Sequence, residues 1–214
     1  MKKLFAGDSC HIFELDNKIS PEISLKVLYI YANLRRYISG DFSCITDIVP
    51  SYKSVAIHFN PYYNDIEKVS LDIEKEINSL LEKYTPQNEM PGSKNIEIPV
   101  VYDGEDLERI SSMKNLPVSR IIEIHSSAEY RVAMIGFKPY FPYLLGLDPL
   151  LAVPRLESPR KRVPAGSVAI GGEQTGIYPE DSPGGWNIIG RTDPEILKGI
   201  NPGDIVIFRG VGTL

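Results

Sequence analysis

The sequence predicts an α+β domain followed by a mainly-β barrel domain. The first half carries two long stretches with helical periodicity, interspersed with short strand-like runs. Most of the 17 glycines and 17 prolines fall between Gly136 and Gly212, where frequent turns separate short apolar segments. This change in character predicts two domains, over residues 1–92 and 93–214, with a boundary near the segment 87–92.

The first elements follow from local signals. Residues 9–15 have the composition of a short strand after the turn at Gly7 and Asp8. Ser20 suits a helix N-cap and Pro21 suits the first helical position. The apolar stripe that begins there continues to Ile38, and Ser39-Gly40 is expected to end the helix.

A hairpin and a second helix come next. Residues 44–49 and 54–59 predict paired strands, because apolar and smaller or polar side chains alternate in the second of them. The run from Ile66 to Tyr84 places apolar residues on one helical face. With a further strand at 96–100, the order βαββα indicates a ferredoxin-like α+β sandwich.

The second half predicts two short helices and then many strands. The helices are expected over residues 106–113 and 117–126. The strands that follow are separated by glycine and proline turns, which is typical of a barrel. They are expected at residues 130–135, 167–170, 174–178, 186–189 and 205–208.

Composition excludes several classes of protein. Hydrophobic residues make up 43% and charged residues 24%, as in ordinary globular proteins. No apolar run is long enough to cross a membrane, and the N-terminal apolar stretch is too short for a signal peptide, so we expect a cytoplasmic protein with no membrane partner. The net charge of −5 argues against nucleic acid as a partner.

Cysteine and histidine spacing predicts no metal site. Cys10 and Cys44 are the 2 cysteines of the chain, and we expect both to be reduced. The 3 histidines lie far apart and match no zinc-ligand spacing.

An aromatic segment over 136–147 is the first candidate for a site. It contains prolines at 139 and 142 and several aromatic residues between glycines, which predicts a rigid loop rather than a strand. Phe141 and Tyr143 are candidate pocket walls. Packing of the same rings on the core of the barrel is an equally good interpretation.

Basic residues gather on the next segment. The prolines at 154, 159 and 164 hold it extended, so Arg155 and Arg162 are candidate anchors for a carboxylate or phosphate. A solvated positive stretch that pairs with nearby acids is the alternative.

Two glycine-rich segments, 171–179 and 182–192, complete the aromatic and basic region. They match no phosphate-binding motif, so turns of a barrel explain them best, and a core role is expected for Trp186. Arg191 is a third candidate anion anchor, and Gln174 and Tyr178 are further candidate binding residues.

His125 and Glu129 lie at the join between a predicted helix and a predicted strand. They are candidates for a general acid–base pair in which the carboxylate holds the imidazole. Favourable interaction of the histidine with the helix dipole is the alternative. No serine or cysteine nucleophile motif accompanies them.

Several ordered motifs resemble the KipI-like, allophanate hydrolase subunit 1 family. The resemblance covers essentially the whole chain. It rests on segments 7–9, 49–52, 102–107, 125–132, 136–147, 154–155, 159–160, 162–168, 174–179, 182–186 and 189–192. Tyr140 departs from the pattern, because the family usually has glycine there. The stretch between Thr192 and Asn201 is also shorter than usual.

The resemblance implies a cyclophilin-like form for the barrel and a larger partner subunit of the KipA or PxpC type. It implies ATP-dependent opening of 5-oxoproline to L-glutamate by the complex, with ATP and magnesium as cofactors of that complex and a small carboxylate or amide as substrate. Two alternatives stay open: inhibition of a sensor histidine kinase through the C-terminal domain, and half of a carboxyltransferase site like that of urea carboxylase.

Overall fold

The computed structural model describes residues 1–39, 44–87 and 92–213. These residues belong to two compact units, Met1–Gly92 and Ser93–Leu214. The predicted helix stop at Gly40 and residues 88–91 of the predicted boundary lie outside the described residues.

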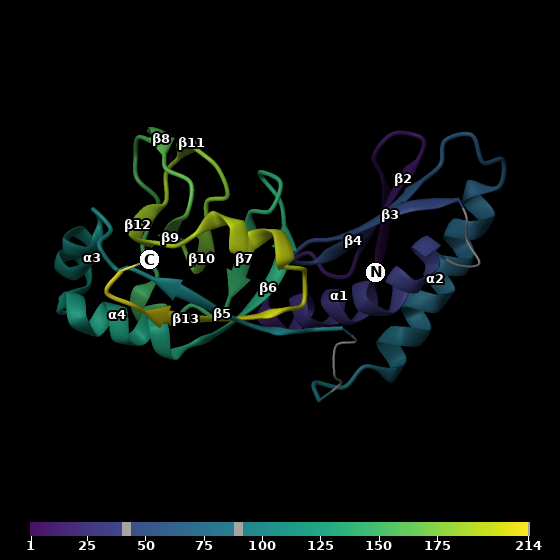
Figure 1. Cartoon of the computed structure of the whole chain (residues 1–214). Coiled ribbons are helices and arrows are strands. Elements are labelled where there is room, and N and C mark those ends of the chain that lie inside the picture. The colour runs from purple at the N-terminus through teal and green to yellow at the C-terminus, as the bar shows by residue number, and fades with distance from the viewer. Residues whose placement is uncertain (40–43, 88–91, 214) are drawn as a thin grey trace. The chain divides into compact units, whose positions relative to one another are not determined.

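An antiparallel sheet and two helices form the first unit (Figure 1). Within the described residues, the sheet has four strands in the order β1-β2-β4-β3. The strands are β1 (Lys2–Phe5), β2 (Cys10–Glu14), β3 (Ile45–Pro50) and β4 (Ser54–Phe59). The helices are α1 (Pro21–Leu34), which continues into the 3-10 turn η1 (Arg35–Ser39), and α2 (Ile66–Lys83).

The start of α1 confirms the predicted capping signal. The hydroxyl of Ser20 accepts a hydrogen bond from the backbone N–H of Ile23 at 3.2 Å, and Pro21 occupies the first helical position. One apolar face of each helix packs on the sheet, around Phe13, Leu34 and Ile73. The α+β class is therefore confirmed.

The fourth strand of this sheet differs from the prediction. Strand β1 pairs with β2 at the sheet edge, whereas residues 96–100 belong to the second unit as part of β5 (Asn95–Val100). There β5 pairs in parallel with β13 (Ile205–Gly210). An alternating apolar pattern identifies a strand but not its neighbour, which explains the error.

The second unit is a mainly-β, nearly closed barrel, as predicted. Its described residues form a seven-stranded sheet in the order β12-β9-β10-β7-β6-β13-β5. Closure comes from Val101 and Arg191, whose backbone groups exchange hydrogen bonds of 3.0 and 2.9 Å between the end of β5 and β12. The remaining strands are β6 (Glu129–Ile135), β7 (Pro142–Leu145), β9 (Ser167–Gly171), β10 (Gln174–Ile177) and β12 (Asn187–Arg191).

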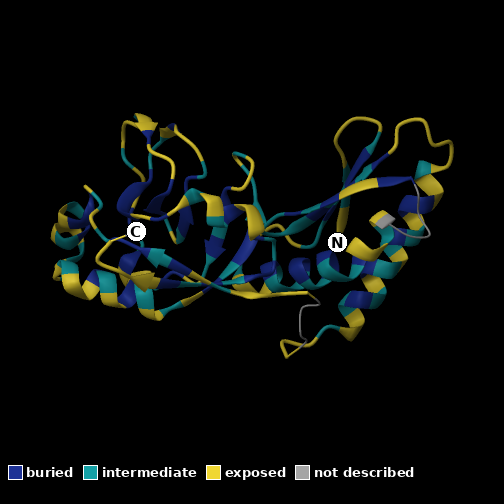
Figure 2. Ribbon diagram, viewed as in Figure 1, coloured by how far each residue is buried: buried dark blue, intermediate teal, exposed yellow. Residues whose placement is uncertain are grey.

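Short helices accompany the barrel. They are α3 (Leu107–Lys114), α4 (Val118–Ser127), and the 3-10 turns η2 (Pro149–Leu151) and η3 (Pro194–Gly199). The two predicted helices are thus confirmed within one residue at each end. Figure 2 shows the buried residues along the barrel strands, where Tyr130, Ile170 and Phe208 belong to the main core.

The predicted rigid loop over 136–147 is partly wrong, because its second half is a strand. β7 lies inside the sheet and pairs with both β6 and β10. Pro142 is the first residue of β7, where the missing N–H does not interrupt the ladder. The aromatic residues before it do form a loop.

Two further strands were not predicted. β8 (Arg160–Val163) and β11 (Ser182–Gly184) form a small antiparallel pair. The basic segment that contains β8 was expected to be extended, and it finds its partner in the glycine-rich segment that follows β10. No helix in the described parts of the chain is long and apolar enough to cross a membrane.

Candidate functional site

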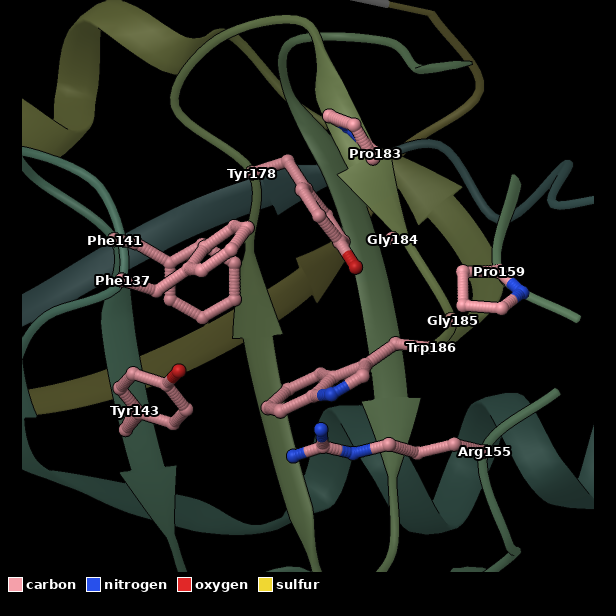
Figure 3. Close-up of a pocket in the computed structure, with 10 residues that line it drawn as sticks. All are labelled: Phe137, Phe141, Tyr143, Arg155, Pro159, Tyr178, Pro183, Gly184, Gly185 and Trp186. Carbon is pink, nitrogen blue, oxygen red and sulfur yellow. The ribbon is translucent and has the colours of Figure 1, made fainter. Parts of the chain in front are cut away.

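An aromatic pocket of about 220 Å³ lies on the outer face of the barrel, beside β8 and β11 (Figure 3). Most of its wall consists of rings, and one guanidinium supplies a charge. The lining residues are Phe137, Phe141, Tyr143, Arg155, Pro159, Tyr178, Pro183, Gly184, Gly185 and Trp186.

The strand pattern of β9 explains why the pocket lies outside the main core. Val168 and Ile170 point into the barrel, so Ala169 and Gly171 face outward. Trp186 covers this outward face. A Cβ on Gly171 would lie 2.6 Å from the indole, and one on Gly176 would lie 3.1 Å from it. Only glycine therefore leaves room for the ring on β9.

Arg155 is the charged group of the pocket. Its guanidinium carbon lies 5.6 Å from the centre of the Trp186 ring, and Figure 3 shows the side chain running alongside the indole. Such a cation–π contact orients the guanidinium. Within the described residues Arg155 makes no ion pair, so its donors remain available to a bound carboxylate.

Asn187 fixes the backbone that carries Arg155. Its side-chain amide donates to the carbonyl of Pro154 at 3.0 Å and to that of Ile170 at 3.1 Å. Its side-chain oxygen accepts from Arg109. The fully buried amide thus ties the segment before Arg155 to the barrel.

Arg160, which is more buried than Arg155, holds two acidic side chains beside the pocket. It donates two hydrogen bonds to Asp106, at 2.8 and 2.9 Å, and its Nε lies 2.8 Å from Glu105. Asp106 also accepts from the backbone N–H of Ile188 at 2.6 Å. This network joins β8 to the start of α3 and to the strand that follows Trp186, and so it supports one wall of the pocket.

Tyr178 and Phe141 form another wall. Their rings meet edge to face with centroids 5.2 Å apart, and both side chains are buried. Burial raises the pKa of Tyr178 above its usual value, so the phenol keeps its proton. Gly184 lies directly against this hydroxyl, because a Cβ there would overlap the phenolic oxygen.

The loop between β6 and β7 forms the rim of the pocket. Phe137 and Tyr140 both adopt a φ of 67°, in the left-handed region that disfavours residues with a Cβ. Their side chains are exposed, while Phe137 also contacts Phe141, with ring centroids 5.5 Å apart. The ammonium of Lys138 donates to Oε1 of Glu180 at 2.6 Å and so ties the loop to the segment between β10 and β11.

Four of the predicted binding residues therefore come together: Phe141, Tyr143, Arg155 and Tyr178. The other three do not line this pocket. Arg162 pairs with Asp181 at the surface, Gln174 is half-buried at the start of β10, and Arg191 pairs with Asp103 beside a different cavity. Their binding roles stay predictions.

The predicted acid–base pair, His125 and Glu129, does not line this pocket. His125 is fully buried, and its ring nitrogens lie 2.8 Å from the Tyr102 hydroxyl and 3.0 Å from the Thr175 hydroxyl. Burial lowers the pKa of His125 to about 3. Glu129 is exposed, and within the described residues the hydrogen-bond partners of this imidazole are Tyr102 and Thr175. The catalytic role of the pair stays a prediction.

Sequence reasoning did not select Trp186 and Phe137 as pocket residues, nor Arg160 as an anchor. Trp186 was expected to be a core residue, and it is both buried and part of the pocket wall. Arg160 and Arg162 belong to the same basic run, so their positions in the sequence do not show which of them is held beside the pocket and which lies at the surface. The signal that separates them is the acid Asp106 at the start of a helix, far away in the sequence.

The arrangement suits a small, flat, weakly polar ligand that carries a carboxylate. The rings can pack on a planar group, and the single guanidinium can bind one carboxylate through two parallel hydrogen bonds. A triphosphate does not fit it, because such a group requires several cationic or amide donors. The described residues also hold no cluster of acids, histidines or cysteines suited to a metal ion.

Comparison with known proteins identifies relatives. The family model described as carboxyltransferase domain, subdomain C and D, matches residues 1–199. The B-type 5-oxoprolinase subunit of Bacillus subtilis is 32% identical over 94% of this chain and 89% of its own. The corresponding 5-oxoprolinase subunit of Escherichia coli O157:H7 is 40% identical over 78% of this chain and 79% of its own.

Solved structures also resemble this chain. The crystal structure of TTHA0988 matches 94% of this chain with a TM-score of 0.77 and 32% identity, and the chain spans 40% of that longer protein. PH0987 from Pyrococcus horikoshii matches 98% of this chain and 97% of its own with a TM-score of 0.52 and 36% identity. The urea amidolyase of K. lactis, at 19% identity and a TM-score of 0.73, shares the fold.

Proposed function

This chain belongs to the family of carboxyltransferase subdomains C and D, and on that premise we propose that it is the B-type subunit of an ATP-dependent 5-oxoprolinase. The reaction opens the lactam ring of 5-oxoproline to give L-glutamate. The single structural observation that supports this most is Arg155, which lies on Trp186 within a pocket of rings and makes no ion pair in the described chain.

The pocket matches the chemistry of this substrate. 5-Oxoproline is a small five-membered lactam with one carboxylate. The guanidinium of Arg155 binds that carboxylate, and the ring lies against Trp186 and Phe141. The protonated hydroxyl of Tyr178 is a donor for the lactam carbonyl. These residues bind and orient the substrate.

The nucleotide belongs elsewhere in the complex. When ATP is bound there, it supplies the phosphoryl coupling that drives an unfavourable ring opening. The pocket of this chain has one guanidinium and does not fit a triphosphate. We therefore assign ATP and magnesium to a larger partner subunit of the KipA or PxpC type, or to a third component.

Reconstitution tests the proposal. The chain is co-expressed with its larger partner and the third component, and glutamate release from 5-oxoproline is measured with and without ATP. We expect release that requires ATP and all components. A complete, folded complex without such turnover would contradict the proposal.

An autophosphorylation assay with the same purified chain distinguishes this function from inhibition of a histidine kinase. We expect no effect of the chain on the autophosphorylation of a sensor kinase encoded by the same organism. Inhibition at a stoichiometric ratio, in the absence of 5-oxoproline turnover by the complex, would favour the regulator.

A further inference from the structure

A second cavity, of about 240 Å³, lies on the barrel away from the aromatic pocket. It is bounded by residues 103–105, 164–167 and 188–191. Gly104 and Gly190 let these segments approach closely, because a Cβ on Gly104 would overlap the carbonyl carbon of Ile189. The cavity therefore sits where the barrel closes.

Both cavities open on the same face of β9. Ser167, Ala169 and Gly171 alternate with the core residues Val168 and Ile170, so they face outward together. Ser167 lines the second cavity, while Gly171 lies beneath Trp186 in the first. The two positions are about 13 Å apart along the strand, which makes the cavities separate sites.

Ser167 indicates that the second cavity takes a polar ligand. Its exposed fraction is 4%, and its hydroxyl makes no side-chain hydrogen bond within the described residues. A hydroxyl that is open to a cavity forms its hydrogen bonds with water or with a polar ligand. Because this residue lines the cavity, its hydroxyl is available to a molecule bound there.

Arg191 lies beside Ser167, since the two are register partners on β12 and β9. Its Nε donates to Asp103 at 2.8 Å. Within the described residues the two terminal nitrogens of Arg191 have no side-chain acceptor. Held by its Nε, the planar guanidinium presents both of these donors to a carboxylate.

Two negatively charged side chains also line this cavity. Asp103 lines the cavity, and so does Glu105, of which Oε1 pairs with Arg160 at 2.8 Å. The other oxygen of Glu105 has no ion-pair partner in the described chain. Two carboxylates beside one guanidinium suit a ligand that carries an ammonium group as well as a carboxylate.

We propose that this cavity binds a free α-amino acid as its zwitterion. The carboxylate of the ligand is held by Arg191 and the hydroxyl of Ser167, and its ammonium faces Asp103 and Glu105. The inference rests on this cavity alone and does not depend on the proposed lactam-opening activity.

Calorimetry with the full-length chain tests the site, using L-glutamate as the probe and glutarate as a matched compound without the ammonium. We expect L-glutamate to bind and glutarate to bind at least about 10-fold more weakly. Arg191→Met is expected to weaken L-glutamate binding about 10-fold or more, and Ser167→Ala several-fold. Arg209→Met, which removes a guanidinium paired at the surface with Glu97, is the matched control and should have no effect.

Four results would overturn the proposal. They are no binding of L-glutamate, equal binding of glutarate, unchanged affinity in both cavity variants, and loss of affinity in Arg155→Met in place of Arg191→Met. Tryptophan fluorescence checks that each variant is folded. Because no partner or ATP is present, failure here leaves the turnover assay of the complex unaffected, and the two proposals fail separately.

Discussion

The phenolic oxygen of Tyr102 lies 2.8 Å from Nδ1 of His125, within the core of the barrel. The Thr175 hydroxyl donates to the carbonyl of Ala169 at 3.0 Å, so it accepts from Nε2 of the imidazole. The proton of the neutral ring is therefore on Nε2, and Nδ1 accepts from Tyr102. Both nitrogens are satisfied only in this uncharged form.

This arrangement predicts a loss of stability in acid. The pKa of His125 is lowered by burial to about 3 in the folded chain, against about 6.5 when unfolded. The unfolded chain thus takes up a proton first, so stability is complete above pH 6.5 and falls as the pH drops toward 3. At pH 5 we expect a loss of about 2 kcal/mol relative to pH 7 from this group, measured by urea unfolding.

The variant His125→Gln removes this titration. It should be less stable at pH 7, yet its unfolding free energy should depend less on pH between 7 and 5. Burial also lowers the pKa of His11, so part of the dependence should persist. An unchanged slope in the variant would contradict the assignment.

Arg155 and Arg162 are expected to differ in their effect on turnover. Arg155→Met removes the guanidinium of the aromatic pocket, and we expect kcat/KM of the reconstituted complex to fall about 10- to 100-fold. Arg162→Met removes a guanidinium that pairs with Asp181 at the surface, and we expect kcat/KM to change less than about threefold. Steady-state kinetics with 5-oxoproline gives the comparison, and equal effects would refute the pocket assignment.

Gly171 is expected to position the single tryptophan. In Gly171→Ala the new methyl group meets the Trp186 ring at 2.6 Å, so the ring must move and unfolding free energy should fall by about 1–3 kcal/mol. Fluorescence should shift to longer wavelength, because the displaced indole becomes more exposed. Gly199→Ala is the control, since its Cβ would meet no atom within 4 Å. Identical spectra for the two variants would disprove the contact.

Tyr140 carries backbone strain at the pocket rim. Its φ of 67° is readily adopted by glycine, so Tyr140→Gly should raise the free energy of unfolding by about 1 kcal/mol. The side chain is half exposed, and little packing is lost with it. Tyr140→Ala keeps the strain and should show no such gain. Thermal unfolding measures the stability of both variants against that of the unchanged chain. A Tyr140→Gly variant less stable than the unchanged chain would contradict the expectation.

Local features of the fold could be predicted from the sequence, and long-range pairings could not. The Ser20 cap and the alternation along β4 depend on neighbouring residues, and both are confirmed. The prolines predict a loop where strand β7 lies, because proline lacks the N–H of a strand ladder, whereas Pro142 occupies the strand's first position, where that N–H is not needed. The partner of β5 depends on residues 205–210, which no local pattern identifies.

The site was predictable to a similar extent. Aromatic residues near glycine turns indicated Phe141 and Tyr143 as walls, and both line the pocket. The direction of each arginine could not be foreseen, because it depends on the β8–β11 pairing and on a distant acid, Asp106. Arg155 meets Trp186 and Arg160 meets Asp106, although both belong to one short basic segment.

The parallel pairing of β5 with β13 has a consequence for how the protein is made. Residues Lys94 and Asp204, which bond beside this pair, are 110 positions apart. On the ribosome, the first unit can complete its sheet while the second is still being synthesised. The barrel stays open until its last strand has left the exit tunnel, so its apolar strands are exposed to chaperones throughout that interval.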